Sequence, residues 1–146
     1  MPNQFVMSEQ SVLKGPLWIT DIDHDGRGIG RTDGKVVFVA DALPGETVWW
    51  QSIREKKNLI EGRARQWRDY SDVRRSPPCA YAVRCGGCQW QHIDDAAQVA
   101  FKQRVFEAQL RRIGQVWPTQ ILAPIYGLLG IIVNVCAFPY AMLLLQ

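Results

Sequence analysis

The sequence predicts a mainly β fold at the N-terminal end: a small OB-like barrel, followed by a cysteine-rich loop and one amphipathic α-helix. Two observations carry this prediction. Short β-branched runs alternate with glycine-containing turns as far as residue 70, and the apolar residues then change to helical spacing after Asp95. At 146 residues, with 47% hydrophobic and 21% charged residues, the chain can bury the core of one medium domain or two small ones.

Four strands are expected in the barrel, and each is a short apolar or β-branched run bounded by turn residues. They cover residues 17–22, 35–40, 46–53 and 59–67. Turn-forming sequences separate them at Asp25-Gly26, Asp33-Gly34 and Leu43-Pro44-Gly45.

Two motif look-alikes in this region are interpreted as turns. The glycines at positions 26, 28 and 30 are spaced like a phosphate loop, but a strand rather than a helix follows them, so we expect a tight β turn. The run from Asp21 to Gly26 copies the start of a calcium-binding EF-hand loop. Its twelfth position is Thr32 rather than glutamate and its flanks are predicted strands, which disfavours calcium.

One helix is expected after the cysteines. Asp94 or Asp95 can cap its N-terminus, and Gly114 closes it. An apolar stripe of this kind is ordinary packing, so we assign it no chemistry and expect it to cover the cysteine loop or brace a neighbouring domain. The stripe consists of Phe101, Val105, Phe106, Leu110 and Ile113.

Three cysteines, Cys79, Cys85 and Cys88, lie within ten residues, and only two glycines separate the last two. Glycine accepts positive φ, so this spacing lets the thiols turn toward one centre. Disulfides fit poorly, because three is an odd number and the first ten residues lack the basic start and apolar run of a secretory signal. The pattern therefore predicts a metal site.

Iron is favoured over zinc at this site. Structural zinc sites usually pair two hooks with two to four intervening residues, whereas five residues separate Cys79 from Cys85. Iron–sulfur clusters accept thiolates at several such spacings. A zinc site that adds His92, four residues beyond Cys88, stays open, as do unmetallated thiols.

A basic stripe lies between Arg54 and Arg75, with eight basic against four acidic residues. Because Trp67 and Tyr70 are interleaved with it, the stripe is typical of a surface that binds a phosphate backbone with stacking platforms nearby. A solvated strand face is the alternative, with equal weight. The candidate RNA-binding residues are Arg54, Lys56, Lys57, Arg63, Arg65 and Arg68.

Two blocks of sequence resemble a known family. The run Asp25-Gly-Arg-Gly-Ile-Gly-Arg31, with Asp33-Gly-Lys-Val-Val-Phe-Val39 and Ala42-Leu-Pro-Gly-Glu46, resembles the TRAM domain, an RNA-binding β-barrel. The run Cys79-x5-Cys85-Gly-Gly-Cys88-x2-Gln91-His92 resembles the iron–sulfur segment of bacterial 23S rRNA (uracil-5-)-methyltransferases. The order and spacing of the blocks match the TRAM-bearing branch of that family over residues 12–126.

The resemblance implies a methyl transfer from S-adenosylmethionine to C5 of a uracil in 23S ribosomal RNA, in the cytoplasm and by a monomer. In the family mechanism a cysteine thiolate adds to C6 of the uracil, C5 takes the methyl group, and a base removes the C5 proton. The target base leaves its stack to be reached. By motif, Cys79, Cys85 and Cys88 carry over as three of the four ligands of a 4Fe-4S cluster, which supports fold and RNA binding.

The resemblance does not extend to catalysis. The family's fourth cluster cysteine, its Rossmann-like S-adenosylmethionine domain, its catalytic cysteine and its general base lie beyond the part that this chain resembles. No strand, glycine-rich loop and helix with a downstream acidic residue occur here to bind the cofactor. We therefore assign no catalytic or cofactor-binding residue, and we expect no methyl transfer by this chain alone.

The apolar tail is interpreted as out-of-frame translation. No charged residue occurs from Gly114 to Gln146, but Pro124 and Pro139 and the lack of a basic flank argue against a membrane helix. The family follows its Ile-Tyr-Gly with Trp-His-Tyr-Arg-x-Arg-x-Arg, and codons shifted by one base permit every one of these residues from Leu129 onward. We infer a base missing near the Gly127 codon, so Cys136 is not counted as the fourth ligand.

The expected organisation is a TRAM barrel over residues 12–70, the iron–sulfur loop and helix over 71–126, and an apolar tail without native structure over 127–146. The expected function is the N-terminal RNA-binding part of the methyltransferase, without genuine membrane association. Two alternatives are a free-standing RNA-binding iron–sulfur or zinc module and a membrane-anchored metal protein.

Overall fold

The computed structural model describes residues 12–85, 89–123, 125–126, 132–133 and 136–137. The chain divides into two compact units. The first unit is Met1–Asp21 with Arg27–Ser71, and the second is Ile22–Gly26 with Asp72–Gln146. A short loop from within the barrel sequence therefore belongs to the second unit.

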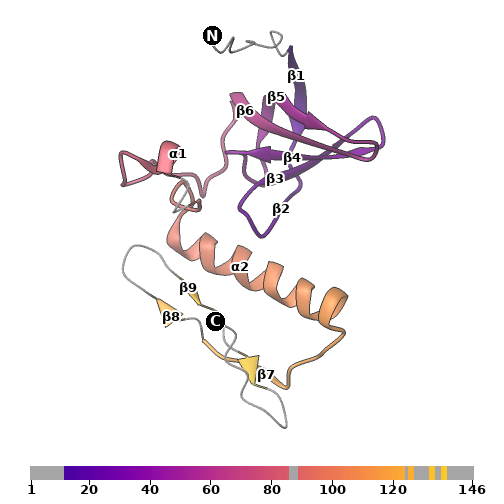
Figure 1. Cartoon of the computed structure of the whole chain (residues 1–146). Helices are drawn as coiled ribbons and strands as arrows, with labels where there is room; N and C mark the ends of the chain where they lie inside the picture. The colour runs from indigo at the N-terminus through magenta and orange to yellow at the C-terminus, as the bar shows by residue number, and fades with distance from the viewer. Residues whose placement is uncertain (1–11, 86–88, 124, 127–131, 134–135, 138–146) are drawn as a thin grey trace, which may run out of the picture. The chain divides into compact units, whose positions relative to one another are not determined.

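The first unit is built on a six-stranded sheet (Figure 1). The strand Thr47–Glu55 pairs antiparallel with Leu13–Trp18 and with Leu59–Asp69, and Gly28–Thr32 pairs antiparallel with Lys35–Ala40. Lys35–Ala40 pairs parallel with Leu59–Asp69. The backbone N–H of Thr20, just after the first strand, donates to the carbonyl oxygen of Ile29 at 2.8 Å, which curls the sheet toward closure. The predicted mainly β, barrel-like fold is confirmed. In sheet order the strands are β1 (Leu13–Trp18), β5 (Thr47–Glu55), β6 (Leu59–Asp69), β4 (Lys35–Ala40), β3 (Gly28–Thr32) and β2 (Asp21–Ile22).

The barrel core follows from the two-residue periodicity of the strands. In β4, Val37 and Val39 are fully buried, while Phe38 between them points to the outer face and is half-buried. Trp50 is the largest buried side chain and is 1% exposed. It shares one apolar cluster with Leu17, Ile19, Val37, Val39, Ala42, Val48, Ile60 and Ala64.

The predicted strand over residues 17–22 was wrong in its bounds. The chain forms β1 earlier and resumes as the two-residue β2, with Ile19 and Thr20 between them. The reason is a change of partner: the N–H of Ile19 donates to the carbonyl of Glu46, whereas that of Thr20 donates to Ile29. The other three predicted strands are present, with ends that differ by at most two residues.

The prediction that all three glycines shape a turn was also wrong. Gly26 lies in the turn with φ of 78°, but Gly28 and Gly30 lie in strand β3. A Cβ on Gly28 would come within 2.8 Å of the Ala42 carbonyl oxygen and of Ile19. These two glycines therefore allow close approach of neighbouring chain segments.

The second unit is built around the helix α2 (Asp95–Gln109), and a five-residue π-helix, Leu110–Gly114, continues it. Asp94 is the N-cap, as predicted, and its carboxylate accepts the N–H of Ala96 at 3.1 Å. Gly114 is the last helical residue, but the left-handed cap is Gln115 with φ of 50°. The remaining elements are α1 (Ala82–Cys85), β7 (Gln120–Ile121), β8 (Ile125–Tyr126), β9 (Ile132–Val133) and β10 (Cys136–Ala137).

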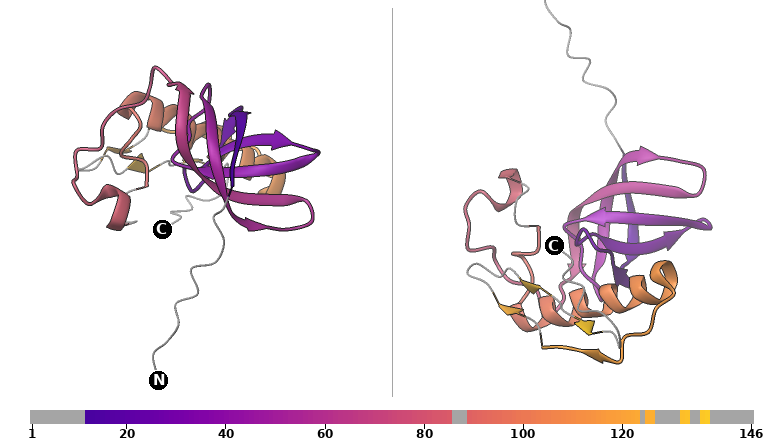
Figure 2. Two further views of the ribbon diagram at one scale, coloured as in Figure 1. Left: turned by 90° about the horizontal axis from the view of Figure 1, so that it is seen from above. Right: turned by 60° about the horizontal axis from the view of Figure 1, so that its bottom comes forward.

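The apolar stripe of the helix is half-buried rather than packed. Phe101, Val105 and Phe106 are of intermediate exposure, and Ile113 is 81% exposed. The buried side chain of α2 is the polar Gln98. Figure 2 shows α2 from two further directions. In the described ranges, no helix combines the length and apolar character needed to cross a membrane. Most of the predicted apolar tail lies outside the described residues.

Candidate nucleic-acid interface and cysteine loop

The outer surface of the barrel is organised by a buried carboxylate beneath it. Glu46 is fully buried, and its oxygens accept three N–H groups: the backbone of Leu43 at 2.9 Å, the indole of Trp67 at 3.1 Å and the backbone of Ser71 at 3.1 Å. A buried carboxylate is tolerated only with such partners. Glu46 thereby fixes the end of β6 against the turn that precedes β5.

The six predicted RNA-binding residues all lie on the β5–β6 hairpin, in two groups. Arg54, Lys56 and Lys57 are exposed at its tip, and none of them has an ion-pair partner among the described residues. Arg63, Arg65 and Arg68 follow along β6. At about 3.3 Å per residue, the start of β6 at Leu59 and Arg68 are roughly 30 Å apart along the strand. The hairpin presents cations along its whole length.

Two of these arginines are placed by β-bulges. Along β5, Trp49 pairs with Gln66 and Trp50 with Ala64, so Arg65 is an extra residue on β6. A second register shift, between Thr47 and Val48, leaves Arg68 as another extra residue. Bulges re-aim side chains and increase local twist, so these arginines do not follow a simple alternation.

The arginines of the strand face are held by neighbouring polar groups rather than being free. The Nε of Arg63 lies 3.3 Å from the carboxylate of Asp41, and the Nε of Arg65 donates to the Gln51 side chain at 3.0 Å. The Nε of Arg68 donates to Asp69 at 2.9 Å. The cations of this face are therefore pre-oriented, with their remaining guanidinium nitrogens available for phosphate.

Arg27 adds a cation to the same face, and the sequence prediction missed it. Its guanidinium lies 4.9 Å from the ring centroid of Phe38, and its Nη1 is 3.5 Å from the carboxylate of Glu61. Phe38 and Glu61 are register partners on β4 and β6. The outward position of Phe38 could be predicted from the sequence, because Phe38 lies between two valines that alternate with it. The contact of Arg27 with Phe38 could not be predicted, because it joins residues that are distant in sequence.

An aromatic pair lies at the far end of β6. The rings of Trp67 and Tyr70 stack with centroids 6.1 Å apart and an interplanar angle of 17°. Trp67 packs against the barrel core, whereas Tyr70 is 65% exposed. Of the two aromatics singled out from the sequence, Tyr70 is the one whose ring is open to a stacking base.

The second unit holds the cysteine loop by hydrogen bonds at its base. Arg74 and Ile93 form an isolated antiparallel bridge. The N–H of Arg75 donates to the carbonyl of His92 at 3.0 Å, and that of Asp94 to Val73 at 2.8 Å. An ion pair of 2.7 Å between Arg75 and Asp95 ties the same base to the start of α2. The segments on either side of residues 76–91 are therefore hydrogen-bonded to each other.

The three predicted metal ligands are described only in part. Cys79 and Cys85 are exposed free thiols. The backbone N–H of Cys79 donates a hydrogen bond to the side-chain oxygen of Gln91 at 3.2 Å. Cys85 is the last residue of the short helix α1. Cys88 lies outside the described residues, as does the side chain of Cys136. These two free thiols are ligands of the kind that an iron–sulfur cluster takes, and they are two of the four that a 4Fe-4S cluster needs.

Trp90 links the cysteine loop to the turn at residues 22–26 within the second unit. A Cβ on Gly26 would lie 3.1 Å from the indole nitrogen of Trp90, so glycine permits this contact. The ammonium of Lys102 lies 5.4 Å from the centroid of the Trp90 ring, and burial lowers the pKa of this lysine. The EF-hand look-alike is therefore a packing element.

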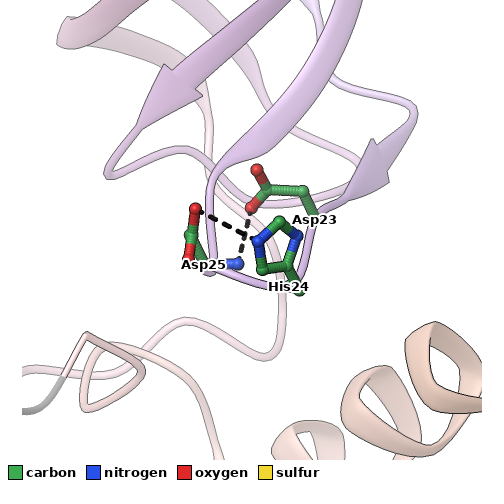
Figure 3. Close-up of side chains that lie close together, drawn as sticks. All are labelled: Asp23, His24 and Asp25. Carbon is green, nitrogen blue, oxygen red and sulfur yellow. Dashed lines mark hydrogen bonds and ion pairs between the residues drawn. The ribbon is translucent and has the colours of Figure 1, made fainter. Parts of the chain in front are cut away.

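The turn itself is held by interactions between its own residues (Figure 3). The carboxylate of Asp23 accepts the backbone N–H of Asp25 at 3.0 Å, as in an Asx-turn, and His24 lies 3.5 Å from Asp25. These three side chains are close together because of that turn. The strands on either side also differ from the helices that flank an EF-hand.

Known proteins match this chain over most of its length. Residues 16–49 match the TRAM domain family. The chain is 52% identical over 109 residues to the 23S rRNA (uracil(1939)-C(5))-methyltransferase RlmD of Neisseria lactamica, a match that covers 75% of this chain and 24% of that relative. The matched segment is related to TRAM-bearing 23S rRNA (uracil-5-)-methyltransferases. The resemblance recognised in the sequence is thereby confirmed.

Further relatives of the same description agree. The RlmD protein of Acidithiobacillus ferrooxidans is 47% identical over 111 residues, 76% of this chain and 25% of the relative. That of Azoarcus sp. is 46% identical over 109 residues, 75% of this chain and 25% of the relative. The chain therefore spans about a quarter of the length of the relatives that it matches.

Proposed function

We propose that this chain is the N-terminal RNA-binding and iron–sulfur portion of an S-adenosylmethionine-dependent 23S rRNA uracil-C5 methyltransferase, and that it acts on ribosomal RNA in the cytoplasm. The observation that carries the proposal is the similarity over 109 residues to a protein described as a 23S rRNA methyltransferase. The TRAM match falls on the barrel that presents the cationic hairpin. Methyl transfer is proposed for the longer protein.

The barrel would bind RNA mainly through phosphates, with stacking as a second contribution. Three unpaired cations at the hairpin tip and three oriented arginines along β6 provide contacts to successive phosphates. Tyr70 provides a face for one base near Arg68. Phosphate contacts of this kind position the strand, and they carry no base specificity by themselves.

The test of RNA binding is its salt dependence, measured with the full chain and a short single-stranded RNA. We expect Lys56→Gln combined with Lys57→Gln to reduce the slope of log affinity against log salt by about 1.4, since each phosphate contact on a single strand contributes about 0.7. The control is Arg111→Gln, which removes one exposed cation of the π-helix. Equal slopes for all three proteins would contradict binding through the hairpin.

The cysteine loop would hold a 4Fe-4S cluster through Cys79, Cys85 and Cys88. When bound, such a group supplies folding free energy, because its thiolate bonds tie distant loop residues together. The chain's own contribution is the pinned loop base and the short helix that ends at Cys85. A zinc site that adds His92 is the competing assignment.

Metal identity is tested by anaerobic reconstitution with iron and sulfide, followed by metal analysis. We expect bound iron and sulfide with absorption from thiolate-to-iron charge transfer, and loss of both in Cys79→Ala and Cys85→Ala. Hydrogen exchange of α2 gives a second readout, because cluster assembly should slow it. Stoichiometric zinc without iron binding would replace the iron assignment.

The alternative function is a free-standing RNA-binding iron–sulfur or zinc module without catalysis. Resequencing the source DNA across the Gly127 codon decides between the two. A continuing Trp-His-Tyr-Arg frame that leads to a cofactor-binding domain supports the methyltransferase. If no such frame exists, the free-standing module replaces it.

A further inference from the structure

A cavity of about 310 Å³ opens in the first unit, at the end of the barrel that carries the β3–β4 and β5–β6 turns. Those two turns lie side by side in both figures of the whole chain (Figures 1 and 2). The cavity is lined both by apolar residues, including Trp50, and by polar residues, including Thr32 and Asp33. None of the residues predicted to bind RNA lines it.

Two ammonium groups converge on one carboxylate at this cavity. The Nζ of Lys35, from β4, donates to one oxygen of Glu55 at 2.6 Å. The Nζ of Lys14, from β1, lies 3.5 Å from the other oxygen and 5.5 Å from the centroid of the Trp50 ring. The three side chains are between a third and a half exposed. The arrangement is therefore a pair of cations around an anion that faces solvent.

The surroundings of this triad are strongly positive. Glu55 is flanked in sequence by Arg54 and Lys56, and Lys57 follows. Of the two carboxylates that line the cavity, Asp33 points to the hydroxyl of Thr32, which donates to it at 3.3 Å. Lys14 and Lys35 line the cavity with these two carboxylates, and Arg54, Lys56 and Lys57 add positive charge to the nearby hairpin tip. An incoming anion is attracted, and Glu55 is the group that it would meet between the lysines.

We propose that this cavity is a phosphate subsite for RNA, in which a backbone phosphate takes the place of the Glu55 carboxylate between Lys14 and Lys35. The inference rests on the RNA binding proposed above. A phosphate carries two non-bridging oxygens, as the carboxylate does, and can accept from both ammonium groups. The Glu55 side chain is 45% exposed, so the displaced carboxylate turns to solvent. The subsite lies next to the hairpin tip, so one strand can occupy both.

Opposite effects of neighbouring substitutions test this subsite with the full chain and a short single-stranded RNA. Lys14→Gln and Lys35→Gln each lower the salt slope by about 0.7, because each removes one phosphate contact. Glu55→Gln raises affinity about threefold, because it removes the competing anion. Asp33→Asn is the matched control, since it removes a cavity carboxylate that does not bind the lysines and asparagine tolerates the φ of 49°. Circular dichroism confirms folding of each variant.

Two measurements decide the inference: the comparison of the variants and a titration with inorganic phosphate. A larger gain for Glu55→Gln than for Asp33→Asn supports it, and equal gains or unchanged slopes for both lysine variants overturn it. Titration with inorganic phosphate, followed by the backbone amide shifts of Lys14, Thr32 and Glu55, separates it from the proposed function. Shifts there without RNA binding support the phosphate site and contradict the proposed function. RNA binding without such shifts overturns the subsite and leaves the proposed function standing.

Discussion

Each of the two units is stabilised internally by a different kind of interaction. The first unit buries one apolar cluster around Trp50 and ties its surface to the fully buried Glu46. In the second unit the buried side chains among the described residues are Ile22, Asp23, Ile93 and Gln98, and the helix stripe stays half-exposed. Hydrophobic burial stabilises the barrel, whereas hydrogen bonds and caps organise the cysteine loop and α2. The barrel is therefore expected to keep its fold under changes that loosen the second unit.

The largest effect that would sharpen this comparison is expected at the centre of the barrel. Trp50→Ala removes the largest buried side chain and should lower the free energy of unfolding by about 3–5 kcal/mol. Urea unfolding followed by far-ultraviolet circular dichroism measures it. The control is Trp117→Ala, at a 69% exposed residue of the second unit, which should change little. Comparable losses for the two would show that the barrel core is not the main source of stability.

A second large effect is expected at Glu46. Glu46→Ala leaves the N–H groups of Leu43, Trp67 and Ser71 without their acceptor, which should cost about 3 kcal/mol. Glu46→Gln keeps one acceptor oxygen in nearly the same volume and should cost less. Urea unfolding of both variants checks the order. If glutamine and alanine were equally destabilising, the three hydrogen bonds would not explain why this carboxyl group is buried.

A smaller loss of stability is expected from alanine substitutions at two glycines, one in a tightly packed strand and one in an open turn. A Cβ on Gly62 would lie 2.5 Å from the Trp50 ring and 2.7 Å from the Gln51 carbonyl oxygen, so Gly62→Ala should cost about 2 kcal/mol by overpacking. Gly45 has φ of 87° and open space around it, so Gly45→Ala should cost about 1 kcal/mol by strain alone. Thermal unfolding of both variants measures the difference. A reversed order would place the tight contact elsewhere in the barrel.

The N-cap of α2 tests whether the second unit loosens by itself. Asp94→Ala removes the acceptor for the N–H of Ala96 and should cost the helix about 1 kcal/mol. Hydrogen exchange should quicken in the first turn of α2 and stay unchanged in β4 and β5. Asp94→Ser keeps an acceptor and serves as the control. Faster exchange in the barrel strands would contradict the energetic separation of the two units.

The difference between the units also explains what the sequence could predict. The strands of the barrel were found because Val37 and Val39 alternate with Phe38, and periodicity survives folding. Strand β3 was missed because its glycines hide the alternation, and their role depends on the approach of Ile19 and Ala42. No local signal could show these contacts between distant segments.

The features of the candidate site also divide into those that local sequence predicts and those that depend on contacts between distant segments. The cationic hairpin was predicted from local composition, and its tip cations are indeed exposed. Arg27 over Phe38, and the convergence of Lys14 and Lys35 on Glu55, were not predicted. Each joins strands that are neighbours only in the folded sheet. The three-cysteine spacing was recognisable locally, and its metal remains a prediction.

The smallest effect is expected from that exposed triad, and its sign can be worked out. The hydrogen bond from Lys35, and then the charges of Lys35 and Lys14, hold the pKa of Glu55 below its usual value in the folded chain. A depressed pKa favours the folded state above the pKa of the unfolded chain, and this contribution is lost as the pH falls through the folded value. The unfolding midpoints of the wild type and Lys35→Met should therefore differ slightly at neutral pH and converge as the pH falls through the folded-state pKa of Glu55. Because the pair is exposed, high salt should also remove the difference. A large difference in unfolding midpoint that persists at low pH and at high salt would show that Lys35 stabilises the fold through packing. Displacing Glu55 from Lys35 would then cost more free energy than the proposed phosphate subsite allows.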